Sequence, residues 1–199
     1  MRFKPPPAHD SAIGWRVEFR PMDIQLTDFE NCCLIVLMGL IVNCLNHFNL
    51  NSIIPITLAD ENMRRAHKRD AIINEKFWFN ASFIQDENCT FSYLEKTDFL
   101  SSAPSEDKKK PPKYEEFYIY EILNGKEDSD FKGLMPVIRA FMKKQKYSIE
   151  NRLEIEHCLS FLLARAKGDV PTGAKFLRDY IQQSPFYMQN SKLSPCLID

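Results

Sequence analysis

The stretch Gly14–Asp23, which reads GWRVEFRPMD, constrains the fold most because charged and apolar side chains alternate along it. The charged members are Arg16, Glu18 and Arg20, and the apolar members between them are Trp15, Val17 and Phe19. β-Branched and aromatic residues suit a pleated surface, and side chains at positions i, i+2 and i+4 of a strand leave the same face. Pro21 lacks a backbone donor, so the strand ends there or lies at a sheet edge. We therefore expect a strand over residues 14–22, with two guanidinium groups flanking one carboxylate and three apolar groups anchoring the other face.

The charged row of Arg16, Glu18 and Arg20 admits two interpretations. A carboxylate is a hard oxygen ligand for Mg²⁺, and a guanidinium binds carboxylate or phosphate oxygens in bidentate fashion. The row therefore suits a site that holds a metal-bridged phosphate beside a carboxylate substrate. The same alternation also describes an ordinary half-buried strand whose outer face carries a row of surface ion pairs. Spacing alone leaves both interpretations open.

The overall composition is that of a globular protein with a substantial hydrophobic core. Of the 199 residues, 44% are hydrophobic and 27% are charged, which are ordinary shares for such a chain. Lysine and arginine number 26 against 27 aspartates and glutamates, giving a net charge of −1. This balance argues against a general nucleic-acid or membrane-surface binder. We therefore expect no nucleic-acid partner and no membrane partner.

The six cysteines do not suggest a disulfide framework. Cys32 and Cys33 are adjacent, the other four are scattered, and no C-x-x-C pair indicates zinc binding or dithiol chemistry. Apolar neighbours around the first three indicate small buried hydrophobes, for which a reducing cytosol is the expected compartment. The chain start has no apolar core of a secretory signal, and the apolar run Cys32–Val42 is too short to span a bilayer before Asn43 interrupts it. A cytoplasmic location is the expectation.

Two helices are expected after the strand. Thr27-Asp28-Phe29-Glu30 has the form of a capping box, which predicts a helix over residues 27–46. This run is apolar nearly all round, so the helix should be buried, with neighbours on every side, in a body larger than this chain. Gly39 would allow close packing at some cost in helix propensity. The second helix is expected over residues 57–71.

The second expected helix carries a crowd of basic residues, namely Arg64, Arg65, His67, Lys68 and Arg69. They could contact a nucleotide phosphate or a partner, or they could form a solvated helix face. The mixed charge pattern, with acidic residues in the first turn, favours the solvated face.

The segment 101–113, SSAPSEDKKKPPK, is polar and proline-containing, and it cannot bury enough apolar area to offset the entropy of ordering. We expect a flexible insert that separates residues 1–100 from a helical subdomain over residues 114–199. In the latter, apolar residues repeat on one helix face at Leu134, Val137, Ile138, Phe141 and Met142. Short loops join the helices, which predicts an antiparallel arrangement with a scaffolding role. Before the insert, the aromatic residues Phe77, Trp78, Phe79 and Phe83 indicate core or strand.

Four stretches of the chain carry a family resemblance. They are MRFKPPP (Met1–Pro7), GWRVEFRPMDIQLTDFEN (Gly14–Asn31), DENMRRAHKRDA (Asp60–Ala71) and ILNGK (Ile122–Lys126). Together with the terminal helices they resemble, in the same order, the catalytic subunit of eukaryotic glutamate–cysteine ligase, also called γ-glutamylcysteine synthetase. The longest stretch is specific, and the resemblance covers most of the chain outside the insert. The chain resembles the carboxy-terminal portion of that family.

The resemblance implies an α+β fold, mainly helical with a few antiparallel strands, as a C-terminal fragment of a glutamine-synthetase-like carboxylate–amine ligase. Residues 1–100 would be the C-terminal part of the catalytic domain. The implied activity is ATP-dependent joining of the glutamate side-chain carboxylate to the cysteine amine through an acyl phosphate, the first step of glutathione biosynthesis. The implied partners are ATP, glutamate, cysteine and the family's regulatory (modifier) subunit.

The resemblance also implies roles for the charged row, because a strand of glutamine synthetases carries a similar Arg-x-Glu-x-Arg pattern. Glu18 would be a ligand of Mg²⁺, and Arg16 would contact the nucleotide phosphates. Arg20 would bind the glutamate substrate or its acyl phosphate, as both a substrate-binding and a catalytic residue. One strand glutamate cannot hold Mg²⁺ alone, and in the family the other ligands come from upstream strands.

Two hypotheses of different class follow. In the first, the chain carries only part of a ligase active site and works within a longer polypeptide or with a complementary fragment. In the second, it is a non-catalytic, ligase-derived protein whose helical region binds a partner or regulates one. The complete charged row favours the first hypothesis.

Overall fold

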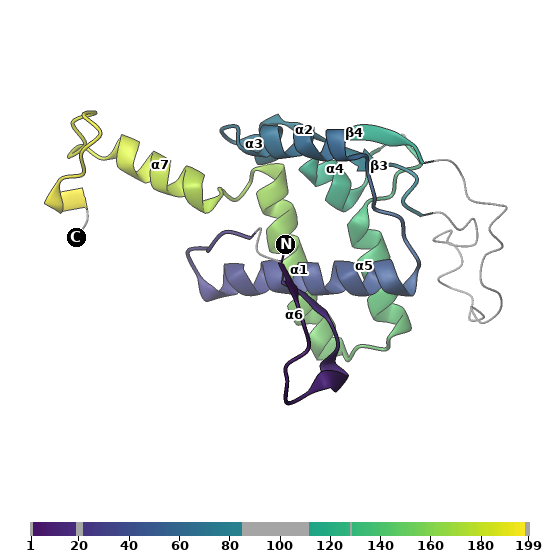
Figure 1. Ribbon diagram of the computed structural model, residues 1–199. Helices are drawn as coiled ribbons and strands as arrows, with labels where there is room; N and C mark the ends of the chain where they lie inside the picture. Colours follow the sequence, from purple (N-terminus) through teal and green to yellow (C-terminus); the bar gives the residue numbers. More distant parts are fainter. Residues whose placement is uncertain (1, 19–21, 85–111, 128, 198–199) are drawn as a thin grey trace.

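The computed structural model describes residues 2–18, 22–84, 112–127 and 129–197 (Figure 1). These residues are mainly helical with two small antiparallel sheets, which confirms the expected α+β class. The strands are β1 (Arg2–Lys4), β2 (Arg16–Glu18), β3 (Lys76–Asn80) and β4 (Tyr114–Tyr118). The helices are α1 (Asp28–His47), α2 (Ile56–Ala66), α3 (Ala71–Asn74), α4 (Ile119–Asn124), α5 (Leu134–Lys144), α6 (Ile149–Lys167) and α7 (Gly173–Gln183). The expected insert at 101–113 falls almost wholly outside the described residues.

The hydrophobic core forms where α1 crosses α5 and α6 (Figure 1). Met135, Ile138 and Met142 of α5 are almost fully buried there, as is Leu159 of α6. The inward face of α5 therefore has the helical spacing that its sequence predicts.

A second part of the core lies against the sheet of β3 and β4. Phe77 of β3 pairs with Phe117 of β4, and the Phe117 ring stacks on Phe131 with centroids 4.3 Å apart. Phe83 is fully covered by the same cluster. The aromatic stretch before the insert is thus strand and core, as expected. Because β3 and β4 pair, the chain segments on the two sides of the insert share one sheet.

Helix α1 begins at the predicted capping box. The Thr27 hydroxyl accepts a hydrogen bond from the Glu30 backbone N–H (3.2 Å), and the Glu30 carboxylate accepts one from the Thr27 N–H (3.1 Å). Two orphan donors of the first turn are satisfied in this way. The capping prediction is confirmed.

The burial of α1 differs from the expectation of cover on every side. Only one face is buried, formed by Cys33, Leu37, Leu40 and Cys44, while Ile35 is 62% exposed and Val42 51% exposed. Part of the hydrophobic surface of this helix therefore has no neighbour within the described residues. The apolar helix is also longer than the run seen in the sequence. At 20 residues it is long and apolar enough to cross a bilayer by length and composition, with 22% of the apolar window buried.

The helix expected over residues 57–71 ends earlier in the structure, and the last expected residue begins a separate short helix. Helix α2 ends at Ala66, and Asp70 adopts a left-handed conformation (φ 54°) before the four-residue α3. A left-handed residue cannot continue an α-helix, and aspartate tolerates this conformation better than most residues.

The corner between α4 and α5 depends on two glycines in close contact. Gly125 and Gly133 have φ of 94° and 78°, and a Cβ on Gly133 would lie 2.2 Å from the Gly125 nitrogen. Only glycine fits such an approach at positive φ. The ILNGK stretch thus ends α4 and brings the start of α5 against it.

Helix α7 has no buried residue and leads away from the rest of the protein toward the C-terminus (Figure 1). Thr172 caps its start, because the Thr172 hydroxyl accepts a hydrogen bond from the Lys175 N–H at 3.2 Å. Its arrangement differs from an antiparallel stack on α6. Helix α6 ends at the left-handed Gly168, which redirects the chain.

Candidate functional site

The predicted active-site strand is one half of an antiparallel hairpin at the N-terminus. The register of β1 and β2 sets Lys4 opposite Arg16 and Arg2 opposite Glu18. Directly opposed residues share a face of the pair, as do residues two apart on one strand. Lys4, Arg16 and Glu18 therefore lie on the same face of the hairpin. Arg20, the third member of the charged row, lies outside the described residues.

The charged face of the hairpin is organised by contacts between its two strands. The Lys4 ammonium lies 2.6 Å from a Glu18 carboxylate oxygen, with the Glu18 side chain 26% exposed. The exposed Arg16 donates from Nη2 to the Pro5 carbonyl oxygen at 3.4 Å. Two cations and one carboxylate on one face can hold phosphate oxygens beside a metal ligand.

Lys4 extends the set of candidate residues found in the sequence. Its position beside Glu18 follows from strand pairing across a loop, which local pattern does not reveal. The three consecutive prolines Pro5–Pro7 were the available signal, because they keep the lead-in extended.

The described residues do not make a metal site by themselves. No group of three or more His, Cys, Asp or Glu side chains that could hold a metal ion occurs among them. Mg²⁺ takes one or two carboxylates together with phosphate oxygens and water. Glu18 fits as one such ligand, and Lys4 beside it would have to move toward a phosphate oxygen when the metal binds.

The opposite face of the hairpin is less covered than the sequence suggested. Trp15 is 72% exposed and Phe3 is 70% exposed, so neither anchors the strand to a core. The two strands have their main contacts with each other rather than with the helices. The expected apolar anchoring is therefore absent at Trp15, whereas the Val17 side chain and Phe19, the other two expected anchors, lie outside what the structure describes.

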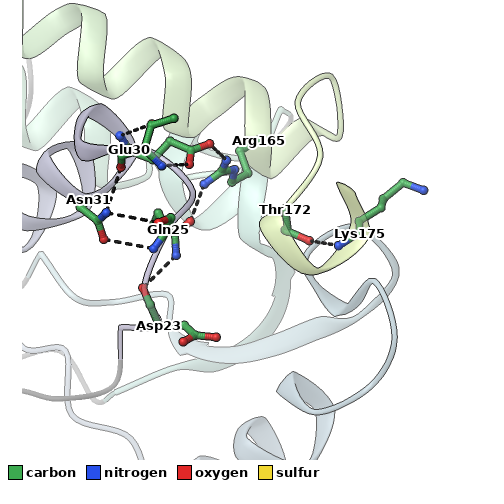
Figure 2. A network of polar contacts seen from close by, with 8 residues as sticks. Asp23, Gln25, Glu30, Asn31, Arg165, Thr172 and Lys175 are labelled. Carbon is green, nitrogen blue, oxygen red and sulfur yellow. Dashed lines mark hydrogen bonds and ion pairs between the residues drawn. The ribbon is translucent and has the colours of Figure 1, made fainter. Parts of the chain in front are cut away.

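The segment that follows the charged row is held by Arg165 from the far end of α6 (Figure 2). Arg165 donates to the Gln25 side-chain oxygen at 2.9 Å and to the Glu30 carboxylate at 2.6 Å. Gln25 in turn donates from Nε2 to the Asp23 carbonyl oxygen at 2.9 Å. Asn31 accepts from the Gln25 N–H at 3.1 Å. We call this network the Arg165 clamp.

The ion pair in the Arg165 clamp is shielded from water. The side chains of Arg165 and Glu30 are 8% and 14% exposed, and the guanidinium also lies over the Phe161 ring at 4.6 Å. Burial alone would raise the pKa of Glu30, but hydrogen bonds from Arg165 and from the Thr27 backbone, with the Arg165 charge, lower it below its usual value. Glu30 is therefore ionised at neutral pH. Sequence reasoning found its capping role but missed Arg165, which lies 135 residues away.

The other chemistry-bearing groups have structural partners. Among the crowd of basic residues, Arg65 pairs with Glu61 (3.0 Å) and Glu116 (2.6 Å), and Lys68 pairs with Glu75 at 3.0 Å. These ion pairs support the interpretation as a mixed-charge surface. The contacts described for these basic residues do not indicate a phosphate site.

The buried thiols of Cys33 and Cys44 are not nucleophiles at neutral pH. Burial, with a hydrogen bond and repulsion from Cys158, raises the pKa of Cys33 to about 12, and burial raises that of Cys44 to about 12. A protonated thiol is a poor nucleophile. The His157 ring instead lies against the Phe29 ring at a tilt, with centroids 4.8 Å apart, so His157 and Cys158 contact different neighbours.

Comparison with known proteins places the chain in a class of ligases. The family model described as glutamate–cysteine ligase matches residues 1–197. Similar curated proteins include the glutamate–cysteine ligase catalytic subunits of Mus musculus (37% identity over 194 residues) and Homo sapiens (36% over 194), each covering 98% of this chain. The glutamate–cysteine ligase of Neurospora crassa is 34% identical over 219 residues, again covering 98% of the chain. No solved structure matches it.

The chain belongs to the glutamate–cysteine ligase family. It spans only 29% of the length of the mouse and human relatives and 30% of the Neurospora protein. The family match thus covers nearly all of this chain. It corresponds to only a limited part of the ligases that the chain resembles.

Proposed function

We propose that this chain supplies part of the active site of a glutamate–cysteine ligase. In this reaction ATP phosphorylates the side-chain carboxylate of glutamate, and the cysteine amine displaces phosphate from the acyl phosphate. The products are γ-glutamylcysteine, ADP and phosphate. The observation that carries the proposal is the shared face of Lys4, Arg16 and Glu18 in a chain of this family.

The chemistry of phosphoryl transfer suits such a face. It needs neutralisation of the phosphate charge and in-line positioning more than covalent help from the protein. Arg16 would contact the nucleotide phosphates, with Lys4 beside it as a second cation. Arg20 would bind the glutamate carboxylate or its acyl phosphate through its planar fork.

Glu18 would supply one oxygen ligand to Mg²⁺. When bound, the metal would neutralise phosphate charge during transfer. The remaining ligands would come from parts of the ligase outside the region matched here, in a glutamine-synthetase-like fold whose sheet the β1–β2 hairpin would extend. The enzyme would work in the cytosol, and the family's regulatory subunit is a further proposed partner.

A non-catalytic role is the second candidate, and α7 favours it. This helix exposes Phe176, Leu177 and Tyr180, which are each 47–57% exposed and lie on neighbouring turns. An exposed amphipathic helix is a common recognition element for a partner protein. In this case the chain would bind or regulate another protein, such as a ligase subunit, without turnover of its own.

One chimera separates the two candidates. The stretch of the mouse catalytic subunit that matches this chain is replaced by the 199 residues, and ADP release is measured with ATP, Mg²⁺, glutamate and cysteine. We expect ADP release that depends on both amino acids from the chimera and none from the isolated chain. A folded chimera without amino-acid-dependent ADP release would favour the non-catalytic role.

Arg20 can be tested in the same chimera with a conservative change. Arg20→Lys keeps the charge but loses the bidentate fork, so the KM for glutamate should rise about tenfold or more. The KM for cysteine should change much less, which makes it the internal control. An unaltered dependence on glutamate would remove the assignment of Arg20.

A further inference from the structure

The outward face of α1 is an apolar surface with no neighbour among the described residues. Cys32, Ile35, Gly39 and Val42 recur at i, i+3, i+7 and i+10, the spacing of one helix face. All four are exposed, Ile35 to 62% and Val42 to 51%. We call this face the outer stripe of α1. A contiguous exposed apolar face of this kind marks an interaction surface.

Gly39 gives independent evidence that something approaches this face closely. It lies in the middle of a long helix, where glycine costs stability relative to alanine. A Cβ at this position would have no atom within 4 Å, so nothing described in this chain requires a glycine there. A glycine on an interacting helix face lets a partner backbone come close. No such partner occurs among the described residues, although Gly39 is suited to one.

The surroundings of the outer stripe favour a protein over a lipid bilayer. The opposite face of α1 packs on α5 and α6, whose outer sides carry charges such as the exposed Arg139–Glu156 pair. Crossing a bilayer would take those charges into the hydrocarbon. Helix α1 also contains no lysine or arginine, whereas helices that lie on membranes are rich in both.

The length of the related ligases indicates which protein could cover the outer stripe of α1. The matched stretch is 29% of the mouse and human subunits, so most of a ligase lies outside it. The hairpin and the segment before α1 expose further apolar residues, among them Trp15, Ile24 and Leu26. A partner that covers α1 and continues over this segment would also supply the missing support of the charged face.

We propose that the outer stripe of α1 is the surface on which the remaining region of the ligase docks. This inference rests on the proposed function, because it takes the occupant from the same enzyme. It adds the location of the contact and the residues that make it. The docked region would pack apolar side chains on Ile35 and Val42 and bring its backbone against Gly39.

The test compares each variant in two settings, the isolated chain and the chimera with the mouse subunit described above. In the isolated chain, Ile35→Asp should leave the thermal unfolding temperature nearly unchanged, because the position faces solvent there. Gly39→Leu should raise it slightly, because leucine is a better helix former than glycine and the position is open. In the chimera both should lower it by several degrees, because a charge or a bulky side chain would enter an interface. Ile149→Asp is the matched control at an isoleucine that is 77% exposed on α6, and its effect should be the same in both settings.

Alkylation of Cys32 by iodoacetamide, located by mass spectrometry, gives a second readout that does not depend on a variant. The rate should fall about tenfold or more from the isolated chain to the chimera. An equal rate in both, in a chimera that unfolds cooperatively, would overturn the proposal. So would variants of the outer stripe that behave alike in both settings, or that disturb the chimera no more than Ile149→Asp does.

Two further measurements separate this inference from its alternatives. Flotation of the isolated chain with vesicles of phosphatidylcholine and phosphatidylserine should show no binding, and binding abolished by Ile35→Asp would assign the stripe to a membrane instead. ADP release by the chimera is recorded independently. Protected Cys32 without ligase activity would support the docking surface and contradict the proposed function. Ligase activity with unprotected Cys32 would support the proposed function and contradict the docking surface.

Discussion

At the scale of single residues, two ion pairs connect the sequence to the candidate site. Lys4 neutralises Glu18 on the charged face, and Arg165 holds Glu30 and Gln25 in the segment that follows that face. The first pair is partly exposed and the second is shielded from water. The second should therefore contribute far more to stability, since exposed pairs are screened and shielded charges depend on their partners.

Removing the guanidinium of the Arg165 clamp should be costly. Arg165→Met leaves the Glu30 carboxylate buried without its partner, and the free energy of unfolding should fall by about 3 kcal/mol. Arg139→Met is the matched control on the exposed pair with Glu156 and should cost less than about 1 kcal/mol. Urea unfolding followed by circular dichroism measures both. Equal losses for the two variants would contradict the shielding of the clamp.

The lowered pKa of Glu30 predicts a pH dependence with a definite sign. A carboxyl group whose folded pKa is depressed binds its proton more readily in the unfolded state, so its stabilisation is complete above the unfolded pKa of about 4.3. It is lost as the pH falls through the folded pKa. The difference in unfolding free energy between wild type and Glu30→Gln should be constant near neutral pH and shrink below about pH 4.3. A difference that grew on acidification would reverse the assigned sign.

At the scale of elements, the sequence predicted what local chemistry decides. The capping box at Thr27 forms as expected, and Ser148 and Thr172 cap α6 and α7 in a similar way, because each cap involves residues only three apart. The apolar spacing of α5 likewise predicts its buried face. The break after Ala66 was missed, because no glycine or proline marks it and aspartate adopts the left-handed turn instead.

Contacts between distant elements were out of reach of the sequence. The partner of Glu30 lies on α6, and the partner of Glu18 lies on another strand. These contacts depend on which strands pair and which helices cross, and neither can be derived from a single sequence. The burial of α1 was overestimated for the same reason, since its hydrophobicity does not say which neighbours are present.

The α4–α5 corner offers a test of element geometry. Gly133→Ala would place a Cβ 2.2 Å from the Gly125 nitrogen at a φ of 78°, and it should cost about 2 kcal/mol or more of unfolding free energy. Gly39→Ala is the same substitution in an open helical position and should stabilise the isolated chain by up to about 1 kcal/mol. Thermal melts of the two variants should therefore shift in opposite directions. Shifts of the same sign would contradict the close approach at the corner.

At the scale of the whole molecule, the proposed catalytic face and the apolar surfaces of this ligase-family chain both lack neighbours among the described residues. Among the described residues, the charged hairpin offers Glu18 as its one carboxylate, Trp15 and Phe3 are exposed on its other face, and the outer stripe of α1 lacks a neighbour. A single missing body would complete all three. This common explanation links the proposed function to the proposed docking surface.

The most direct measurement of the central claim is the Mg²⁺ dependence of turnover in the chimera carrying Glu18→Gln. Loss of a metal ligand should lower kcat by about a hundredfold or more and weaken the response to Mg²⁺. The unfolding temperature should stay close to that of the parent. Glu150→Gln, on the exposed start of α6, is the control and should turn over like the parent. Unchanged kcat and unchanged Mg²⁺ dependence in Glu18→Gln would contradict the assignment of this hairpin to the active site.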